Sequence, residues 1–335
     1  MTLTPRRAAR LAARWGLRGV RRARRAHGLI LMYHRVADAR LDPWNICVSP
    51  GNFREQMRAL TAMADPVPLE DLPEALRRGR SRRPVFAVTF DDGYVDNLTT
   101  ARPLLAERNV PATIFVATGL IGSGRAYWWD RLADALLGAD VLPERIALSS
   151  LAGDFVWQDR ALSNSGATGR QARQRLHMQL WSRLRLLADD HREAALEELV
   201  RLPGISTGGD PSARPMDADE LRQLAADEHV CIGAHTLTHP VLPALSREQK
   251  ARQVELCAAQ CLELVGETPR LFAYPYGDLD PETVDVVRAA GYTMACSTRE
   301  DLVWQGDDPL LLPRIAVGNW SGDAFRRRLA WYWLP

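Results

Sequence analysis

The 335-residue sequence is poor in cysteine and contains no long apolar run. Its five cysteines are an odd number spread through apolar segments, which argues against a disulfide framework and favours a reducing compartment. The absence of any run of about 18 apolar residues argues against a membrane-spanning helix. With 46% hydrophobic residues, the chain can instead bury a sizeable core, in one large α/β domain or two smaller ones.

The first 27 residues lack acidic side chains and carry nine arginines, with Leu11, Trp15, Leu17 and Val20 between them. The uninterrupted apolar core of a signal peptide is also absent, so we do not expect a cleaved one. Two interpretations of this basic leader remain open, a solvated segment and an amphipathic helix that lies on anionic lipid. We therefore expect a cytoplasmic protein that, under the second interpretation, is peripheral at the inner membrane face.

Short segments rich in β-forming residues alternate with helical patterns along most of the chain. The expected strands cover residues 29–33, 85–90, 112–117, 230–234, 271–274, 292–296 and 315–317. The expected helices cover residues 53–63, 98–108, 217–227, 247–265, 281–290 and 324–333. Alternating strands and helices predict parallel pairing through right-handed crossovers, hence a doubly wound sheet or a barrel, and seven strands favour the barrel.

The regular alternation breaks between residues 118 and 217. This stretch holds the aromatic cluster Tyr127-Trp128-Trp129 and helical patterns at 171–187 and 191–200, and it is too long for a loop. We predict a helical insertion at about residues 125–215 within a barrel domain of residues 28–335.

Two adjacent carboxylates, Asp91 and Asp92, follow the second expected strand and precede Gly93, which lets the backbone turn sharply. Neighbouring side chains at a strand end point in different directions. One carboxylate can therefore bind a metal while the other faces a reacting water. An ordinary turn is the alternative interpretation of this motif taken alone.

Two of the seven histidines, His235 and His239, follow the strand expected at 230–234. If the chain turns helically there, a spacing of four places both rings on one face, where they can bind one cation. Two histidines and one aspartate with an open fourth position form the ligand set of a catalytic zinc-type site. This pattern favours metal ligation over two core histidines.

A third motif, Tyr274-Pro275-Tyr276-Gly277, ends another expected strand with a proline-stiffened aromatic turn. Its exposed backbone N–H groups could stabilise an oxyanion. A packed aromatic turn without chemical function is the alternative.

Together the three motifs resemble those of the polysaccharide deacetylase family, also called NodB-homology or carbohydrate esterase family 4 proteins. The resemblance covers roughly residues 28–320 in architecture and is weakest over the insertion. It implies a distorted (β/α)7 barrel and a metal-dependent hydrolase that removes N-acetyl groups from an N-acetylated sugar or polysaccharide. It assigns Asp92, His235 and His239 to a divalent metal, with zinc expected ahead of cobalt or nickel, and Asp91 to the general base.

The sequence departs from the commoner family pattern in two places. The late histidine motif is absent, whereas Met32-Tyr33-His34-Arg35-Val36 resembles exopolysaccharide-modifying members whose acid histidine lies near the N-terminus, which implies His34 as the general acid. The third motif has Ala273 where the family carries an arginine that orients the base. We predict that Arg314, at the end of another expected strand, supplies this contact, since barrel enzymes assemble their sites at the C-terminal ends of strands.

The expected substrate is an N-acetylated glycan, and the resemblance gives Tyr274, Pro275 and Tyr276 a part in binding it. Trp129 could stack on a pyranose ring and Asp130 could accept hydrogen bonds from sugar hydroxyls, with core packing as the alternative for the tryptophan. Two other functions remain open, a catalytically silent carbohydrate-binding barrel and a deacylase of another non-peptide C–N bond. Nucleic acid is not an expected partner, because the corresponding fold signatures and aromatic interleaving are missing.

Overall fold

The computed structural model describes residues 27–78, 83–151, 155–205 and 209–333. The basic leader predicted at residues 1–27 lies outside the described residues except for His27. Among the described helices, none combines the length and the apolar character needed to cross a bilayer.

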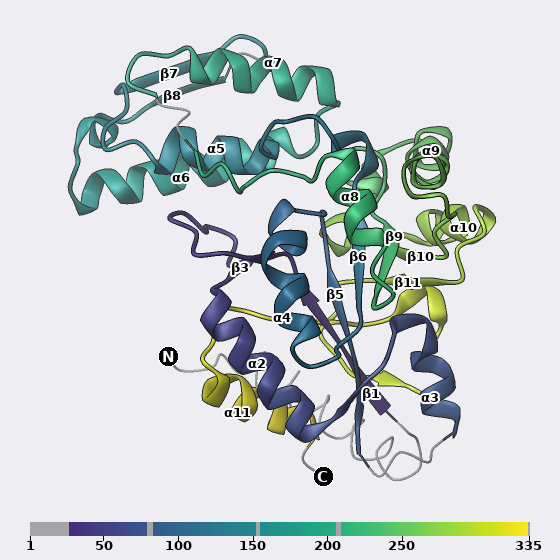
Figure 1. Cartoon of the computed structure of the whole chain (residues 1–335). Coiled ribbons are helices and arrows are strands. Elements are labelled where there is room, and N and C mark those ends of the chain that lie inside the picture. The colour runs from purple at the N-terminus through teal and green to yellow at the C-terminus, as the bar shows by residue number, and fades with distance from the viewer. Residues whose placement is uncertain (1–26, 79–82, 152–154, 206–208, 334–335) are drawn as a thin grey trace, which may run out of the picture.

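Within the described residues, seven strands form a distorted barrel (Figure 1). They are β1 (His27–Tyr33), β5 (Val85–Phe90), β6 (Ala112–Val116), β9 (Val230–Ala234), β10 (Leu271–Ala273), β11 (Met294–Cys296) and β13 (Ile315–Ala316). Parallel pairing runs from β13 through β1, β5, β6, β9 and β10 to β11. A single bridge between Cys296 and Leu312 joins β11 to the segment before β13, so the barrel closes through a short, irregular seam. The expected strands and barrel are confirmed.

The surroundings of β1 explain why the barrel strands have continuous apolar sequences. Leu29 and Leu31 pack under the surrounding helices, whereas Ile30 lies in the barrel interior with Ala87 and Phe115. A strand buried on both faces has no polar side to produce an alternating pattern. Two short strands, β4 (Asp65–Pro66) and β12 (Val303–Trp304), extend the sheet beside β5 and β1.

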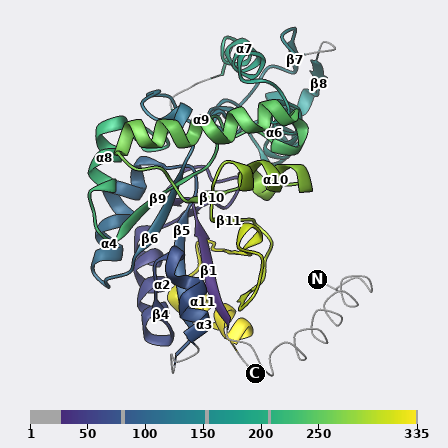
Figure 2. The same cartoon turned by 90° about the vertical axis from the view of Figure 1, so that its right-hand side faces the viewer.

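Helices pack around the outside of the barrel (Figure 2). They are α2 (Pro50–Met63), α3 (Leu72–Arg78), α4 (Arg102–Ala106), α8 (Ala218–Ala225), α9 (Arg247–Val265), α10 (Pro281–Ala289) and α11 (Gly322–Trp333). Local signals set their ends: a capping box between Ser246 and Gln249 begins α9, and Gly266 ends it with φ 82°. Helix α3 is the member of this set that the sequence analysis did not expect.

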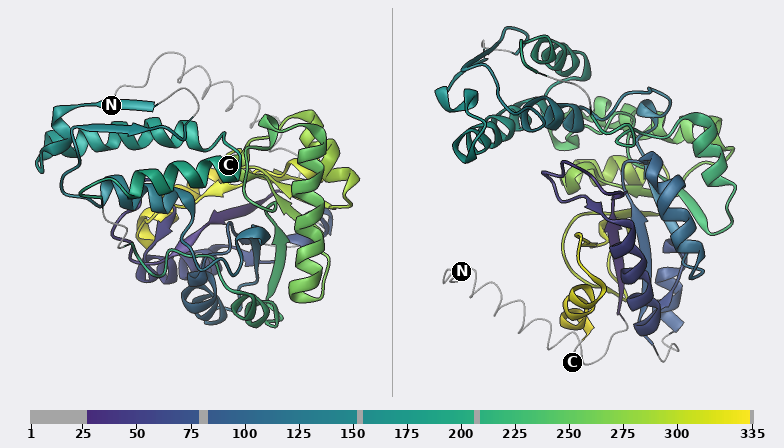
Figure 3. Two further views of the ribbon diagram at one scale, coloured as in Figure 1. Left: turned by 90° about the horizontal axis from the view of Figure 1, so that it is seen from above. Right: turned by 60° about the vertical axis from the view of Figure 1, so that its left-hand side comes forward.

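The insertion folds as a layer over the C-terminal ends of the strands (Figures 1 and 3). It consists of α5 (Trp128–Leu137), β7 (Arg145–Leu148), β8 (Phe155–Gln158), α6 (Ala167–Leu184) and α7 (Asp189–Val200). Its own apolar core includes Trp128, Leu132, Leu176 and Leu196. The helical insertion predicted at about residues 125–215 also contains two strands, because β7 and β8 form an antiparallel hairpin. Each of these strands has only four residues, too few to show a clear alternating pattern.

Candidate active site

A pocket lies between the C-terminal ends of the barrel strands and the insertion. Polar residues singled out in the sequence meet aromatic side chains in its wall, which is formed by His34, Trp44, Ile46, Asp91, Asp92, Trp129, Trp181, His235, His239, Tyr276 and Thr298. The site therefore forms where barrel folds place catalytic residues.

Asp92, His235 and His239 converge on one point. Their ligand atoms all lie within 4.8 Å of one another, and Asp92 Oδ1 is 3.5 Å from His235 Nε2 and 3.4 Å from His239 Nε2. Asp92 Oδ1 is buried and has no hydrogen-bond partner among the described residues. His235 Nδ1 lies 2.7 Å from the carbonyl oxygen of Ala273, which can only accept, so the proton sits on Nδ1 and the lone pair of Nε2 points at Asp92.

The electrostatics of these three residues fit a divalent cation. Burial, reinforced by the charge of Asp91, raises the pKa of Asp92 well above its usual value. Burial also lowers the pKa of both His235 and His239, which keeps the imidazoles neutral and able to donate lone pairs. A cation would compensate the buried charge of Asp92 and satisfy its unpaired oxygen.

The backbone reaches this geometry through left-handed residues. Asp92 and Gly93 have φ values of 75° and 80°, and a Cβ on Gly93 would lie 2.9 Å from Val116 Cγ1. The helical turn considered for His235 and His239 does not form. Instead Thr236 and His239 have φ values of 67° and 58°, and Thr236 Oγ1 accepts a 3.0 Å hydrogen bond from the N–H of His239. This tight turn brings the two ring centroids to 4.8 Å.

Asp91 lies beside the triad and makes the contact with Arg314 that the strand positions predicted. Arg314 Nη1 and Nη2 each donate a 2.6 Å hydrogen bond to a different oxygen of Asp91. Burial opposes ionisation of Asp91, but the charge and the hydrogen bonds of Arg314 outweigh it and hold the pKa well below the usual range. Asp91 is therefore a carboxylate with a fixed plane.

His34 follows β1 and is partly exposed to the pocket. Burial is the main cause that lowers the pKa of His34 to about 4, and the charge of Asp91 opposes this shift. The pocket therefore holds a second titratable group near Asp91.

The third motif contributes fewer residues to the pocket wall than the sequence suggested. Tyr276, with φ 58°, lines the pocket, and the two hydrogen bonds of its turn are donated by Gly277 and Asp278. Tyr274 is buried in the core, where its hydroxyl donates to the carbonyl of Leu310. Pro275 starts the turn and does not line the pocket. The geometry therefore does not support direct substrate binding by Tyr274 and Pro275, and Tyr276 is the residue of this motif that lines the pocket.

Of the neighbours Trp129 and Asp130, only Trp129 lines the pocket. Trp129 lines the pocket, but its ring stacks on Tyr127 at 4.6 Å and its Nε1 donates to Tyr94. Asp130 lies behind this layer, accepts a 2.8 Å hydrogen bond from Tyr94, and has a pKa that burial raises to about 7. The geometry does not support the predicted contact between Asp130 and sugar hydroxyls, because Asp130 does not line the pocket and its carboxylate accepts from Tyr94.

Two further tryptophans, Trp44 and Trp181, form an outer aromatic wall of the pocket that the sequence did not reveal. Trp44 comes from the loop after β2 (Arg35–Val36), and Trp181 comes from α6, yet their ring centroids lie 4.6 Å apart. Neither tryptophan stands at a strand end, so no local signal marked it.

The family model for polysaccharide deacetylases matches residues 78–144 and 192–295, slightly more than half of the chain. The unmatched stretch between these segments lies within the insertion. The chain belongs to the polysaccharide deacetylase family, and it is a hydrolase of the deacetylase class.

Solved structures share the fold at low identity. The Streptococcus pyogenes deacetylase PplD, in complex with acetate, is 16% identical with a TM-score of 0.58, and 93% of this chain and 100% of that chain are covered. IcaB from Ammonifex degensii is 19% identical with a TM-score of 0.57 and coverages of 92% and 97%. A de-N-acetylase from Aggregatibacter actinomycetemcomitans is 14% identical with a TM-score of 0.55 and coverages of 90% and 99%. No curated protein matches the chain.

Proposed function

We propose that the protein is a metal-dependent hydrolase that removes N-acetyl groups from an N-acetylated sugar or polysaccharide. The observation that carries the proposal is the convergence of Asp92, His235 and His239 beside the Asp91–Arg314 pair. Family membership supports the reaction class, and the fold is shared with proteins described as deacetylases and de-N-acetylases.

Asp92, His235 and His239 would hold the divalent cation, with zinc proposed ahead of cobalt or nickel. When bound, such a cation acts as a Lewis acid and lowers the pKa of water at the site. The proton on Nδ1 of His235, fixed by the Ala273 carbonyl, keeps Nε2 available for it.

Asp91 is the proposed general base. It accepts the proton that the attacking water loses as the water oxygen bonds to the acetamide carbon. The fork of Arg314 keeps Asp91 ionised and fixes the direction of its oxygens, at the cost of a weaker basicity.

His34 is the proposed general acid. A protonated imidazole donates to the amine nitrogen as the C–N bond breaks, since an amine does not leave as an anion. The backbone N–H of Tyr276, in the turn at the pocket wall, is the proposed donor to the oxygen of the tetrahedral intermediate.

The decisive experiment measures acetate release from N-acetylglucosamine oligomers by protein loaded with zinc, cobalt or nickel. Asp91→Asn and His34→Ala should each lose nearly all turnover while retaining the metal. Asp140→Asn and His191→Ala, at exposed positions of the insertion, serve as matched controls and should keep full activity. Stoichiometric metal without acetate release from any oligomer would favour a silent carbohydrate-binding barrel, and release only from other amides would favour a different C–N deacylase.

A further inference from the structure

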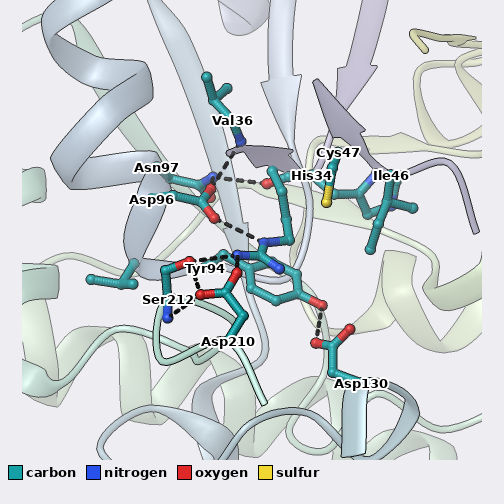
Figure 4. Close-up of polar contacts among 12 residues, drawn as sticks. His34, Val36, Ile46, Cys47, Tyr94, Asp96, Asn97, Asp130, Asp210 and Ser212 are labelled. Atoms are coloured by element: carbon teal, nitrogen blue, oxygen red, sulfur yellow. Dashed lines mark hydrogen bonds and ion pairs between the residues drawn. The ribbon is translucent and has the colours of Figure 1, made fainter. Parts of the chain in front are cut away.

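Next to the proposed acid lies a cluster of charged and polar side chains, which we call the Arg35 cluster (Arg35, Asp96, Asn97, Asp210 and Ser212) (Figure 4). The side chains of Arg35 and Asp96 are each only 3% exposed. Arg35 Nε donates to Asp96 Oδ2 at 2.9 Å, and Arg35 Nη2 donates to Ser212 Oγ at 3.0 Å and to Asp210 Oδ2 at 3.3 Å. One arginine thus connects three segments of the chain.

The same cluster holds the backbone at His34 and just after it. Asn97 Nδ2 donates a 2.8 Å hydrogen bond to the carbonyl of His34, and Asp96 Oδ1 accepts a 3.0 Å bond from the N–H of Val36. On the other side of His34, the N–H of Asp91 donates to the carbonyl of Tyr33 at 3.0 Å. The turn that carries His34 is therefore tied to residues 91–97, the segment that carries Asp91 and Asp92.

The cluster also reaches the insertion. Asp210 and Ser212 lie where the chain returns from the insertion to the barrel, and Ser212 donates to Asp210 through both its N–H and its hydroxyl. The guanidinium of Arg35 lies 4.9 Å above the ring of Tyr94, whose hydroxyl donates to Asp130 on α5. The position of the insertion is thereby coupled to the turn that carries His34.

Stability alone is a weak reason to bury such a pair. The cost of desolvating two charges offsets most of their attraction, and apolar side chains of similar volume would stabilise the fold about as well. An apolar pair cannot supply direction. The guanidinium of Arg35 holds Asp96 through Nε and the 210–212 segment through Nη2, and Asp96 and Asn97 in turn hydrogen-bond to the backbone at residues 36 and 34.

We propose that Arg35, Asp96 and Asn97 are positioning residues that hold His34 in register with Asp91, and that Asp210 and Ser212 make this register depend on the insertion. The inference rests on the role of His34 proposed above. None of these five residues lines the pocket, so they act through the placement of His34 and not on the substrate.

The test compares Asn97→Ala and Arg35→Lys with the wild-type protein in steady-state acetate release. Asn97→Ala removes a neutral donor to the His34 carbonyl, and Arg35→Lys keeps the charge but loses the fork. We expect kcat to fall about 10- to 100-fold with KM within about twofold, since a misplacement of about 1 Å can cost about 100-fold. His34→Ala should alter one limb of the pH profile, and the same limb should change in Asn97→Ala and Arg35→Lys. In addition, Arg35→Lys should retain more activity than Arg35→Met.

Lys250→Met is the matched control, because Lys250 is also a buried cation, 2% exposed, that pairs with Asp280 and Glu282 away from the pocket. This variant should lose thermal stability but keep kcat and the pH profile. If the wild-type protein is active and Asn97→Ala keeps the same kcat and pH profile, the positioning role is overturned and the proposed function stands. A wild-type protein inactive on every substrate would overturn the proposed function, and the catalytic role of the cluster with it.

Discussion

Arg314 donates two hydrogen bonds of 2.6 Å to the two carboxylate oxygens of Asp91, although the residues are 223 positions apart in the sequence. The arginine is fully buried and also donates to the carbonyl of Ser297 and to Thr89 Oγ1. This contact is the one predicted for Arg314 in place of an arginine in the third motif, which has Ala273 at that position. The plane of the Asp91 carboxylate is therefore fixed by a residue that immediately precedes β13, and not by a residue of the third motif.

Arg314→Ala should lower kcat by about 100-fold, because Asp91 loses its fixed orientation. It should also lower the free energy of unfolding by about 3–5 kcal/mol, since it leaves a buried carboxylate without its partner. Acetate-release kinetics and urea denaturation measure the two effects. The same change made together with Asp91→Asn should cost much less stability, because no charge is left unpaired; equal costs in both backgrounds would contradict the electrostatic explanation.

A divalent cation should stabilise the wild-type fold and not the fold of His239→Ala. A ligand present at 100 times its dissociation constant adds about 2.7 kcal/mol to the free energy of unfolding. Thermal unfolding with and without zinc, together with metal analysis of the purified protein, checks this. His229→Ala is the control, since His229 is half exposed at the start of β9, and it should keep the full metal effect. If zinc, cobalt and nickel all leave the unfolding temperature of the wild-type protein unchanged, the proposed metal site is excluded.

The parts of the site that follow strands could be predicted from the sequence, because parallel strands bring their C-terminal ends to one place. Asp91 follows β5, whereas Arg314 immediately precedes the short strand β13, which pairs with Leu31 and Met32 near the C-terminal end of β1. Arg314 therefore reaches the same edge of the barrel as Asp91, although it stands before its strand and not after it. The spacing of His235 and His239 was also informative, although the turn between them is left-handed and not helical. Motif spacing gave the right partners with the wrong local conformation.

The parts contributed by tertiary packing could not be predicted. Trp44 and Trp181 meet only because the insertion folds back over the barrel, and the orientation of Asp130 depends on its bond to Tyr94. Asp96 and Asn97 carry no motif, and their function depends on which backbone groups they reach. Residues defined by a contact partner, and not by a position at a strand end, leave no local pattern.

Trp44→Ala and Trp129→Ala should have different effects. Trp44 is partly exposed at the pocket wall, so its loss should raise KM about tenfold, equivalent to roughly 1.4 kcal/mol of binding, with kcat and stability nearly unchanged. Trp129 is 5% exposed and packs on Tyr127, so its loss should lower the free energy of unfolding by about 3–5 kcal/mol. Kinetics on N-acetylglucosamine oligomers measure the effect on KM, and urea denaturation measures the effect on stability. An unchanged KM in Trp44→Ala would show that Trp44 does not take part in substrate binding.

His177 should make the insertion sensitive to acid. Its side chain on α6 is 1% exposed beside Trp44, with ring centroids 5.4 Å apart, and its Nε2 has no hydrogen-bond partner within the described part of the chain. Burial lowers the pKa of His177 to about 4. The fold therefore favours the neutral ring, and the stability it contributes is complete above the unfolded-state pKa of about 6.5 and is lost as the pH falls toward 4.

This single group should cost about 2 kcal/mol of unfolding free energy between pH 7.5 and pH 5, at about 1.36 kcal/mol for each pKa unit. His177→Gln, which cannot be protonated in this range, should reduce the pH dependence of unfolding by that amount, whatever its own stability at pH 7.5. The comparison of slopes matters because His34, His235 and His239, whose pKa values are also lowered, add acid sensitivity to both proteins alike. Parallel curves for the two proteins from pH 7.5 to pH 5 would show that His177 is protonated as easily in the fold as in the unfolded chain, which its burial without a partner argues against.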